Sequence, residues 1–181
     1  MSSKAARRYA YAFLETAKEN NILEAVKDDV TLISDVLKAS KDLRLFLRSP
    51  LVNKDHKRAA LLEIFDKKVQ PLTLQLMKLL TEKSRESLLE MIIRHFNDYY
   101  NDHHGIIEID ITSAYELEEK QVGTLIKQLE TKTGKKVELN RQINSELIGG
   151  MLVRIDDTVI DGSVKHKLSQ LKDRLTSTAV K

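Results

Sequence analysis

Two kinds of hydrophobic pattern follow one another along the chain, and the change comes at Gly105. Before this glycine, apolar residues recur at intervals of three and four, which is the spacing of an amphipathic helix. The clearest example is the set Leu23, Val26, Val30, Ile33 and Leu37. After the glycine, the β-branched run Ile106–Ile111 indicates a strand. The pattern predicts a helical first part, residues 1–104, and a mixed second part, residues 105–181.

Helix start and stop signals divide residues 1–104 into six predicted helices. Ser40 and Asn53 are favourable N-caps, Pro71 suits a first helical position, and Ser49-Pro50 ends a helix. The predicted helices are residues 3–20 and 22–40, a short helix between Ser40 and Pro50, and three more over 53–67, 71–82 and 84–105. The inward sets are expected to be Ala5, Tyr9, Ala12 or Phe13, and Ala17 in the first helix, and Ala59, Leu61 or Leu62, and Phe65 in the fourth. This part is predicted to be a six-helix bundle.

The second part predicts a compact α/β unit. A strand over 106–113 is followed by a helix over 114–132 and a short strand at Val137 and Leu139. Period-two alternation over 151–155 and again at 159–160 predicts two antiparallel strands joined by the acidic turn Asp156-Asp157. Ser163 is a natural N-cap for a last helix that runs to about residue 175. The whole chain is therefore expected to be an α+β protein of two domains, 1–104 and 105–181.

Two features around the predicted hairpin each allow two interpretations, one functional and one structural. Gly149 and Gly150 could let the backbone approach a phosphate, but no GxGxxG or GxxxxGK[ST] motif surrounds them, and a bulge or close backbone packing is favoured. The amides after Ser163, with Lys165 and Lys167 nearby, could hold an anion, although a plain capped helix is favoured. Neither feature predicts a bound cofactor.

Composition and charge narrow the class of protein. The chain has 181 residues, 41% of them hydrophobic and 31% charged, which is ordinary for a soluble globular protein. It has no Cys, which excludes disulfides and thiolate metal sites. Residues 1–104 carry 18 Lys and Arg against 15 Asp and Glu, a surplus too small and too interspersed to predict nucleic-acid binding. The basic opening, Lys4, Arg7 and Arg8, resembles a transit peptide but runs straight into a periodic helix, so mature protein is favoured.

Candidate chemistry is sparse. Asp102-His103-His104 is the sole cluster of metal-ligand type, but neighbouring helical residues point about 100° apart and no HExxH motif supports it. No GxSxG motif is present, and Asp156-Asp157 has no partnering base. We therefore expect no catalytic, metal or cofactor site. The first helix is instead expected to expose aromatic side chains, because Tyr9, Tyr11 and Phe13 cannot all point inward. Some of that aromatic surface faces a partner or solvent.

The segment from Leu147 to Leu171, LIGGMLVRIDDTVIDGSVKHKLSQL, resembles the C-terminal signature of the delta subunit (oligomycin-sensitivity-conferring protein, OSCP) family of rotary F-type ATP synthase. The likeness extends over nearly the whole chain, through Arg8-Tyr9-Ala10 with Ala12 and Phe13, then 46–50 (FLRSP), 79–83 (LLTEK) and 133–137 (TGKKV). The chain departs from the family pattern at one single position and at one pair of neighbouring positions. Asp156 stands where the family usually has Gly, and Lys165-His166 replaces Arg followed by a small residue.

The resemblance implies a non-catalytic stator subunit that links the catalytic head to the peripheral stalk. Its six-helix domain would grip the N-terminal helix of an alpha subunit in a groove between the first and fifth helices, lined by Tyr9, Ala12, Phe13, Leu76 and Leu79. Its C-terminal domain would hold the ends of the b subunits, and Gly149, Gly150, Asp161, Gly162 and Ser163 would be a structural signature. No nucleotide or other cofactor is implied.

The resemblance also implies one copy per complex and membrane association only through that complex. The chain opens on Met1 with no long leader, so we expect a bacterial protein at the cytoplasmic face of the inner membrane. The runner-up interpretation is an RNA-binding module, with Lys135-Lys136 and the basic N-terminus contacting phosphates. It is disfavoured because the strands lack aromatic residues and no KH-type GxxG loop is present.

Overall fold

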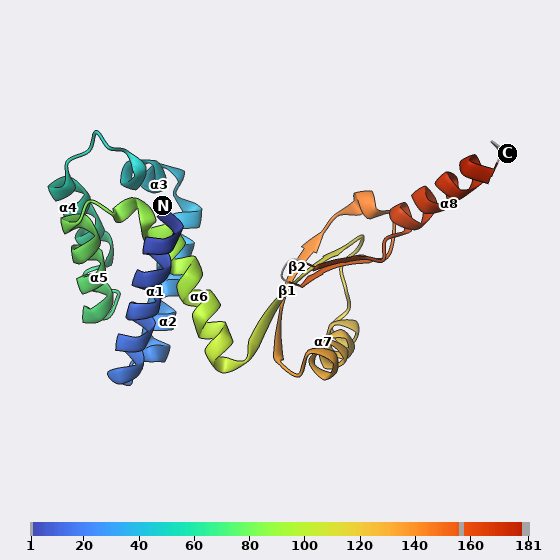
Figure 1. Ribbon diagram of the computed structural model, residues 1–181, viewed down its shortest axis with the longest axis horizontal. Helices are drawn as coiled ribbons and strands as arrows, with labels where there is room; N and C mark the ends of the chain where they lie inside the picture. The colour runs from blue at the N-terminus through green and yellow to red at the C-terminus, as the bar shows by residue number, and fades with distance from the viewer. Residues whose placement is uncertain (1, 156–157, 179–181) are drawn as a thin grey trace. The chain divides into compact units, whose positions relative to one another are not determined.

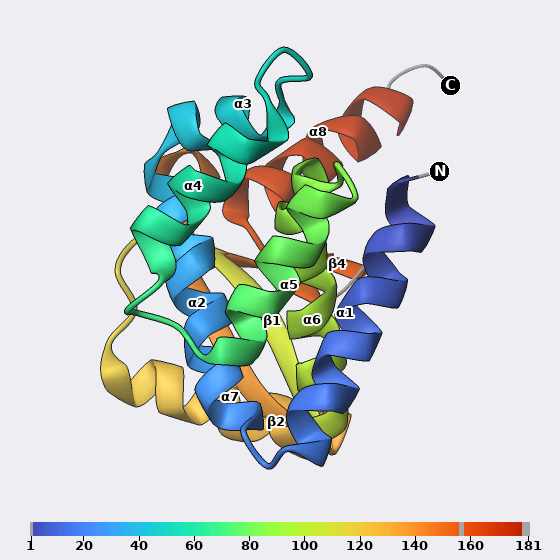
Figure 2. The ribbon, with the colours of Figure 1, turned by 90° about the vertical axis from the view of Figure 1, so that its left-hand side faces the viewer.

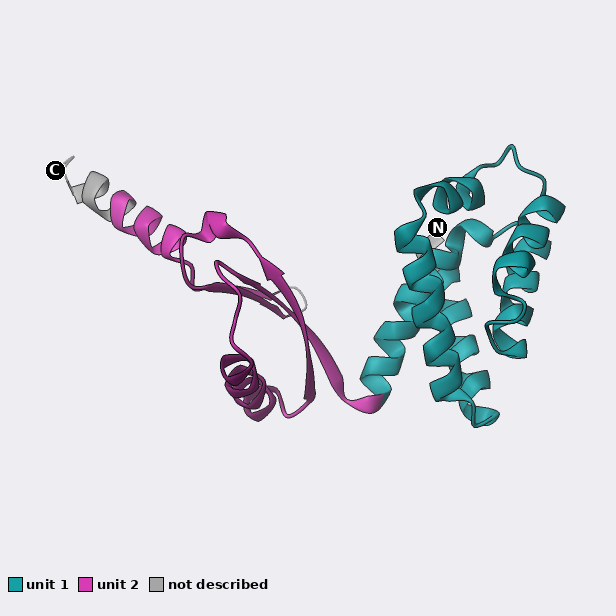
Figure 3. Cartoon of the chain, turned by 180° about the vertical axis from the view of Figure 1, so that it is seen from behind, with its two compact units in different colours: residues 1–103 teal, residues 104–181 magenta. Residues whose placement is uncertain are grey.

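A computed structural model describes residues 2–155 and 158–178 and shows an α+β protein (Figure 1). The chain forms two compact units, residues 1–103 and residues 104–181, coloured teal and magenta in Figure 3. Unit 1 is helical, and unit 2 contains a mixed sheet. Each unit has its own hydrophobic core, and each is described by itself.

The helices of unit 1 begin and end close to the positions that the cap residues predict. They are α1 (Ser2–Glu19), α2 (Leu23–Ala39), α3 (Lys41–Arg48), α4 (Lys54–Phe65), α5 (Pro71–Glu82), the 3-10 helix η1 (Glu86–Leu88) and α6 (Leu89–His104) (Figure 2). The Ser40 hydroxyl accepts a hydrogen bond from the Leu43 amide at 3.1 Å, and Asn53 Oδ1 accepts one from the Asp55 amide at 3.1 Å. Both therefore act as N-caps.

The inward face of α1 differs from the prediction by about one residue. The buried residues of this helix are Ala6, Ala10, Phe13, Leu14 and Ala17. Ala12 is exposed, and Ala5 and Tyr9 are half-buried. The physical reason is that Leu14 and Phe13 together bury more apolar area than Tyr9 would, while the Tyr9 hydroxyl needs a polar partner near the surface. The expectation that the three aromatic residues of α1 cannot all point inward is confirmed, since Tyr11 is 56% exposed.

The inward face of α4 was also predicted wrongly at one position. Leu61 and Phe65 are buried as expected, but Ala59 is exposed and Lys57 is only 3% exposed. Lys57 lies one turn before Leu61 on the same face. It is tolerated there because its ammonium group pairs with the Glu86 carboxylate at 2.5 Å and donates to the Leu47 carbonyl at 3.0 Å.

Unit 2 is built on a four-stranded sheet of order β2-β1-β3-β4, counted over the described residues. The strands are β1 (Ile106–Ser113), β2 (Lys136–Ile143), β3 (Met151–Ile155) and β4 (Thr158–Asp161). β1 and β2 are parallel, and the helix α7 (Glu119–Thr133) connects them; β3 pairs antiparallel with both β1 and β4. The antiparallel hairpin is thus confirmed, while its predicted turn, Asp156-Asp157, lies outside the described residues.

The predicted helix over 114–132 begins later, at Glu119. The Ala114 amide bonds the Gly150 carbonyl at 3.3 Å, which keeps that residue beside the sheet. A capping box between Glu118 and Gln121 then starts α7, and Gly134, at φ +67°, ends it. β2 is also longer than the two residues that suggested it, and the 3-10 helix η2 (Ser145–Leu147) follows it.

One face of the sheet carries the core of unit 2. Ile109, Ile111, Val137 and Val153 are buried against the apolar side of α7, including Leu125 and Leu129. Side chains on the opposite face, such as Glu108, Asp110 and Glu138, are exposed. This is the usual arrangement of a sheet with one covered face. The last helix is α8 (Val164–Thr178), and its residues 164–172 are exposed and do not belong to that core.

Candidate partner-binding surfaces

The first candidate surface lies on α1 and α5, which run along the same side of unit 1 in Figure 2. Of the five residues that the resemblance assigns to it, Ala12 and Leu79 are exposed, with Leu79 at 39%. Tyr9 and Leu76 are half-buried, and Phe13 is only 5% exposed. The structure therefore separates an outer pair that a partner could touch directly from Phe13, which supports the surface from below.

Residues of both helices and of the segment after α5 define this surface, called here the α1–α5 face. Phe13 and Leu76 line a common internal cavity of about 10 Å³, too small to hold more than one water. At one end the Arg85 guanidinium donates to the Tyr9 hydroxyl at 3.0 Å and lies 5.8 Å from the centre of the Tyr9 ring. Side chains on the inner side of the α1–α5 face are therefore closely packed. On its outer side, Ala12 is exposed and has only a small side chain.

The signature glycines, Gly149 and Gly150, meet Asp161, Gly162 and Ser163 at the start of α8. The Gly162 amide donates to the Met151 carbonyl, and the Val164 amide donates to the Gly149 carbonyl, each at 2.9 Å. These residues, called here the joint, fasten the first turn of α8 to the beginning of β3. The joint is the structural role of the signature segment.

Side-chain caps complete the joint. Asp161 Oδ1 accepts from the Ser163 amide at 2.8 Å, and the Ser163 hydroxyl accepts from the His166 amide at 3.1 Å, which confirms Ser163 as the N-cap. Two hydrogen bonds that Ser163 donates to Asp161, first from its amide and then from its hydroxyl, together with the nearby charge of His166, lower the pKa of the Asp161 carboxyl. The amides of 162–164 and 166 are all used within the chain. The anion-binding alternative for this helix start is therefore not favoured.

The two glycines of the pair are required for different reasons. A Cβ atom on Gly150 would lie 2.4 Å from the Gly162 carbonyl oxygen, and Gly150 has φ +74°. A Cβ atom on Gly149 would lie 3.0 Å from a methyl group of Val164. Gly150 thus permits a close approach of backbone to backbone, and Gly149 leaves room for the Val164 side chain, in agreement with the close packing that the sequence favoured for the pair.

The second candidate surface is on unit 2, around and beyond the joint. Its large apolar side chains are more than a third exposed, and they are Ile143, Ile148, Val159, Ile160, Val164, Leu168 and Leu171. Every residue from Val164 to Lys172 is exposed. Sequence reasoning placed α8 but did not identify this surface, although the spacing of Val164, Leu168 and Leu171 was available as a signal.

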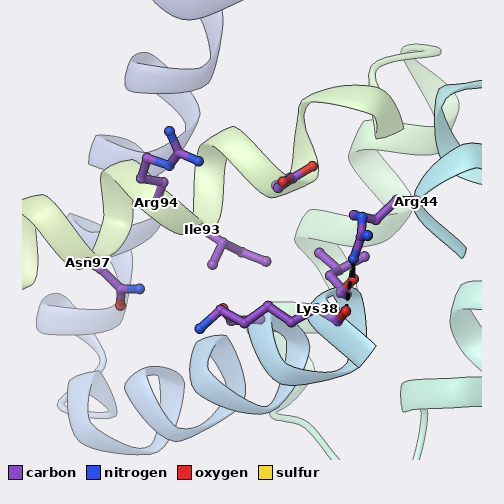
Figure 4. A pocket seen from close by; sticks show the side chains of 8 residues that line it. Lys38, Arg44, Ile93, Arg94 and Asn97 are labelled. Carbon is purple, nitrogen blue, oxygen red and sulfur yellow. Dashed lines mark hydrogen bonds between the residues drawn. The ribbon is translucent and has the colours of Figure 1, made fainter. Parts of the chain in front are cut away.

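A third feature is a polar cavity of about 230 Å³ between α2, α3 and α6. Arg44, at one end, donates hydrogen bonds to the carbonyl groups of Leu37 and Lys38, so its guanidinium caps the C-terminal end of α2. In Figure 4, Lys38 and Arg94 lie on opposite sides of Ile93, so the cationic side chains do not converge on one point. The cavity does not have the arrangement of an anion or substrate site.

Three buried charged residues were missed by sequence reasoning. Asp29, Lys57 and Glu86 are between 3% and 6% exposed. Asp29 on α2 accepts from the Gln70 amide at 2.7 Å and from the Thr73 hydroxyl at 2.5 Å, so it caps the start of α5 from another helix. Each charge connects two elements of unit 1. The helical spacing could have indicated the burial of two of them: Asp29 follows Val26 by three residues and Lys57 precedes Leu61 by four, so each lies on the apolar face of its helix.

Neither a metal-ligand cluster nor a membrane-spanning helix is found among the described residues. No group of three or more His, Asp or Glu side chains is placed to hold a metal ion there. The buried charges of unit 1 are engaged between helices. No helix within residues 2–155 and 158–178 is long and apolar enough to cross a lipid bilayer.

Comparisons with known proteins agree with one another. The model of the family described as ATP synthase delta (OSCP) subunit matches residues 5–175. The chain is 43% identical over 176 residues to ATP synthase subunit delta of Chlorobaculum tepidum, covering 97% of each chain. It is 42% identical over 174 residues to the same subunit of Chlorobaculum parvum, covering 96% of each.

A solved structure has the same fold. It is a chain in the cryo-EM structure of the Toxoplasma gondii mitochondrial ATP synthase hexamer, 24% identical to this chain, with a TM-score of 0.74. The match covers 94% of this chain and 97% of that one.

Proposed function

Because the chain belongs to the ATP synthase delta (OSCP) subunit family, we propose that its two units hold two different neighbours in the F-type ATP synthase. The protein is a non-catalytic subunit of that complex. The observation that carries the proposal is the presence of separate exposed apolar surfaces on the two units. A subunit that transmits force needs durable contacts with two neighbours and no reactive group.

Unit 1 is proposed to act as one six-helix bundle that binds the catalytic head. The occupant of the α1–α5 face is the N-terminal helix of an alpha subunit, lying over Ala12 and Leu79. Small residues allow two helices to approach closely, and Ala12 is exposed where the approach would occur. Tyr9, fixed by Arg85, borders the contact, while Phe13 and Leu76 keep the surface in shape from beneath.

Unit 2 is proposed to bind the ends of the peripheral-stalk b subunits. Its exposed apolar side chains lie on β4 and α8 and at the end of β2, away from the core beneath α7. The joint gives α8 a fixed starting direction relative to β3. A stalk held by unit 2 and a head held by unit 1 would be connected through one chain, and proton flow would then be coupled to ATP synthesis.

The proposed location follows from these contacts. One copy serves each complex, and the chain reaches the membrane only through its neighbours. In a bacterium that position is the cytoplasmic face of the inner membrane. The relatives from Chlorobaculum support a bacterial setting.

RNA binding, the alternative function, is not supported. The exposed face of the sheet carries the carboxylates of Glu108, Asp110 and Glu138. Lys136 and Arg154 are exposed among these acids, so that face is not the basic patch that phosphate binding requires. None of the four strands contributes an aromatic side chain on which a base could stack.

Reconstitution of the full chain with its two neighbours tests the proposal. Isolated catalytic head, the soluble part of the b subunits and the chain are mixed in pairs and all together, and mass photometry reports the assemblies. We expect binary complexes of the chain with each neighbour and a ternary complex in which it bridges them.

Proton pumping supplies the functional measurement. Membranes stripped of the chain should lose ATP-driven proton pumping and regain it when the chain is added back. A head that docks on the stalk equally well without the chain, with pumping intact, would overturn the proposal.

A further inference from the structure

The exposed apolar residues of α8 follow a heptad pattern. Val164, Leu168 and Leu171 are separated by four and three residues, and the sequence continues with Leu175 after another four. This is the alternation of d and a positions in a coiled coil. The side chains of Val164, Leu168 and Leu171 are 37%, 52% and 54% exposed, respectively. The stripe is therefore a coiled-coil seam that nothing in unit 2 covers over its described residues.

The charged residues at the positions that flank this seam are basic, and one of them, Lys165, also lies 3.7 Å from the exposed carboxylate of Glu146. With Val164 and Leu171 at d, the e and g positions are Lys165, Lys167, Lys172 and Arg174. The outer positions carry His166, Ser169, Gln170 and Asp173. Charges at e and g determine which helix a coiled coil accepts and in which orientation. A basic pair of flanks therefore specifies a partner with acidic flanks.

The same charges exclude a second copy of α8 as the partner. In a parallel pair, g of one helix faces e of the other; in an antiparallel pair, e faces e and g faces g. Every such pairing would place Lys or Arg against Lys or Arg, which disfavours association.

The joint explains how α8 can present its seam. A single helix of 15 residues is marginal in water without tertiary contacts. Here the first turn is capped by Ser163 and fastened to Gly149, so the helix is nucleated at one end. The remaining stabilisation is left to a partner along the seam.

We infer that α8 pairs through this seam, as a heterotypic coiled coil, with a helix whose flanking positions are acidic. The inference rests on the proposed function, which supplies the occupant: a terminal helix of a peripheral-stalk b subunit. Val164, Leu168 and Leu171 form the apolar contact. Lys165, Lys167 and Lys172 select the acidic partner.

Binding of the soluble b-subunit domain to the full chain, measured by calorimetry at low salt, tests this inference. The variant K165E/K167E/K172E should bind at least about tenfold more weakly, because both flanks then repel an acidic helix. The matched control K127E/K132E/K136E makes the same charge change at exposed lysines of α7 and β2 and should bind within about twofold of the unmodified chain. L168D/L171D should remove detectable binding.

Folding is not at issue in these variants, because the substituted residues are exposed in unit 2. Circular dichroism and hydrogen exchange of the sheet should match those of the unmodified chain. Two synthetic helices supply a second probe: both carry Leu at a and d, one with Glu and the other with Lys at e and g. We expect the Glu helix to bind and the Lys helix not to.

The outcomes separate the two proposals. If the b-subunit domain binds the unmodified chain and all variants alike, the α8 inference is wrong and the stalk-binding function stands. If that domain fails to bind even the unmodified chain, the stalk-binding function of unit 2 fails, and the α8 inference fails with it. Equal binding of both synthetic helices would show that the basic residues beside the seam do not select an acidic partner, and the α8 inference would be wrong.

Discussion

Gly150 and Gly162 approach each other so closely that a Cβ atom on Gly150 would lie 2.4 Å from the Gly162 carbonyl oxygen. No side chain can be accommodated at that distance without moving backbone. Gly150 also has φ +74°, a conformation that L-residues with a side chain rarely adopt. The glycine therefore serves two requirements at once, and the position of α8 relative to β3 depends on it.

Gly150→Ala is expected to destabilise unit 2 by about 2 kcal/mol or more, because the backbone strain and the steric clash add. Urea unfolding followed by hydrogen exchange of unit 2 peptides measures the change. Gly123→Ala on α7 is the matched control. It lies within a helix and a Cβ there would meet nothing within 4 Å, so a gain of about 0.5–1 kcal/mol is expected. Equal effects of the two substitutions would contradict this account.

Asp161 makes the joint sensitive to acid. Hydrogen bonds from Ser163 and the charge of His166 hold the pKa of Asp161 below its ordinary value of 3.8. Its ionised form therefore stabilises the fold at neutral pH, and this contribution is lost as pH falls below 3.8 and through the lower folded value. Hydrogen exchange at the first turn of α8 should accelerate in that range. Asp161→Asn should remove this dependence, and an unchanged acid response in that variant would refute it.

Prediction from sequence succeeds where one face of an element is uniformly apolar. In α2, Val26, Val30, Ile33 and Leu37 are all buried as the spacing requires. The pair Gly149-Gly150 likewise indicated close packing at the start of a strand, although the sequence did not show that Gly162 and Val164 would be its neighbours. These features depend on local pattern, which a single sequence records.

Prediction fails where a polar group is buried through a partner far away in sequence. Lys57 was not among the residues predicted to face inward, and it is buried because Glu86, 29 residues away in the sequence, neutralises its ammonium group. Nothing in the local pattern of α4 indicates that partner. The candidate α1–α5 face shows a similar limit, because Phe13 of α1 packs against Phe96 of α6, a residue 83 positions later that the local pattern of α1 does not indicate.

The Lys57–Glu86 pair yields a test by double substitution. Lys57→Met leaves the Glu86 carboxylate buried without its counter-ion and should destabilise unit 1 by about 3–5 kcal/mol. Lys57→Met combined with Glu86→Leu should recover most of that loss, because an apolar pair of similar size needs no compensating charge. Thermal and urea unfolding measure both. Lys54→Met, at an exposed position of the same helix, should be close to neutral, and additive effects of the pair would contradict the coupling.

Asp29 provides a second test inside unit 1. Its carboxylate accepts from the Gln70 amide and the Thr73 hydroxyl, and hydrogen bonds to charged acceptors are stronger than neutral ones. Asp29→Asn keeps the size but removes the charge, so a loss of about 1.5–3 kcal/mol is expected. Hydrogen exchange should rise first at the start of α5. The neighbouring Asp28 is exposed, and Asp28→Asn should leave both the stability and the exchange unchanged.

Ala12 tests the proposed contact with the catalytic head. The residue is exposed on α1, so Ala12→Leu should leave unit 1 folded, since Leu is nearly as favourable as Ala in a helix. If a helix of the alpha subunit lies over this position, the larger side chain holds the two helices apart, and affinity should fall by about tenfold or more. Calorimetry with a peptide of the alpha-subunit N-terminus measures it.

Ala59→Leu is the control for the Ala12 substitution, because it makes the same change at an exposed position of α4. It should leave the affinity unchanged. Unaltered affinity in the Ala12 variant as well would place the alpha-subunit contact elsewhere on unit 1. Loss of affinity in Ala12→Leu alone, with both variants unfolding at the same urea concentration, would locate the catalytic head on the α1–α5 face, because only a direct contact distinguishes two equally exposed alanines.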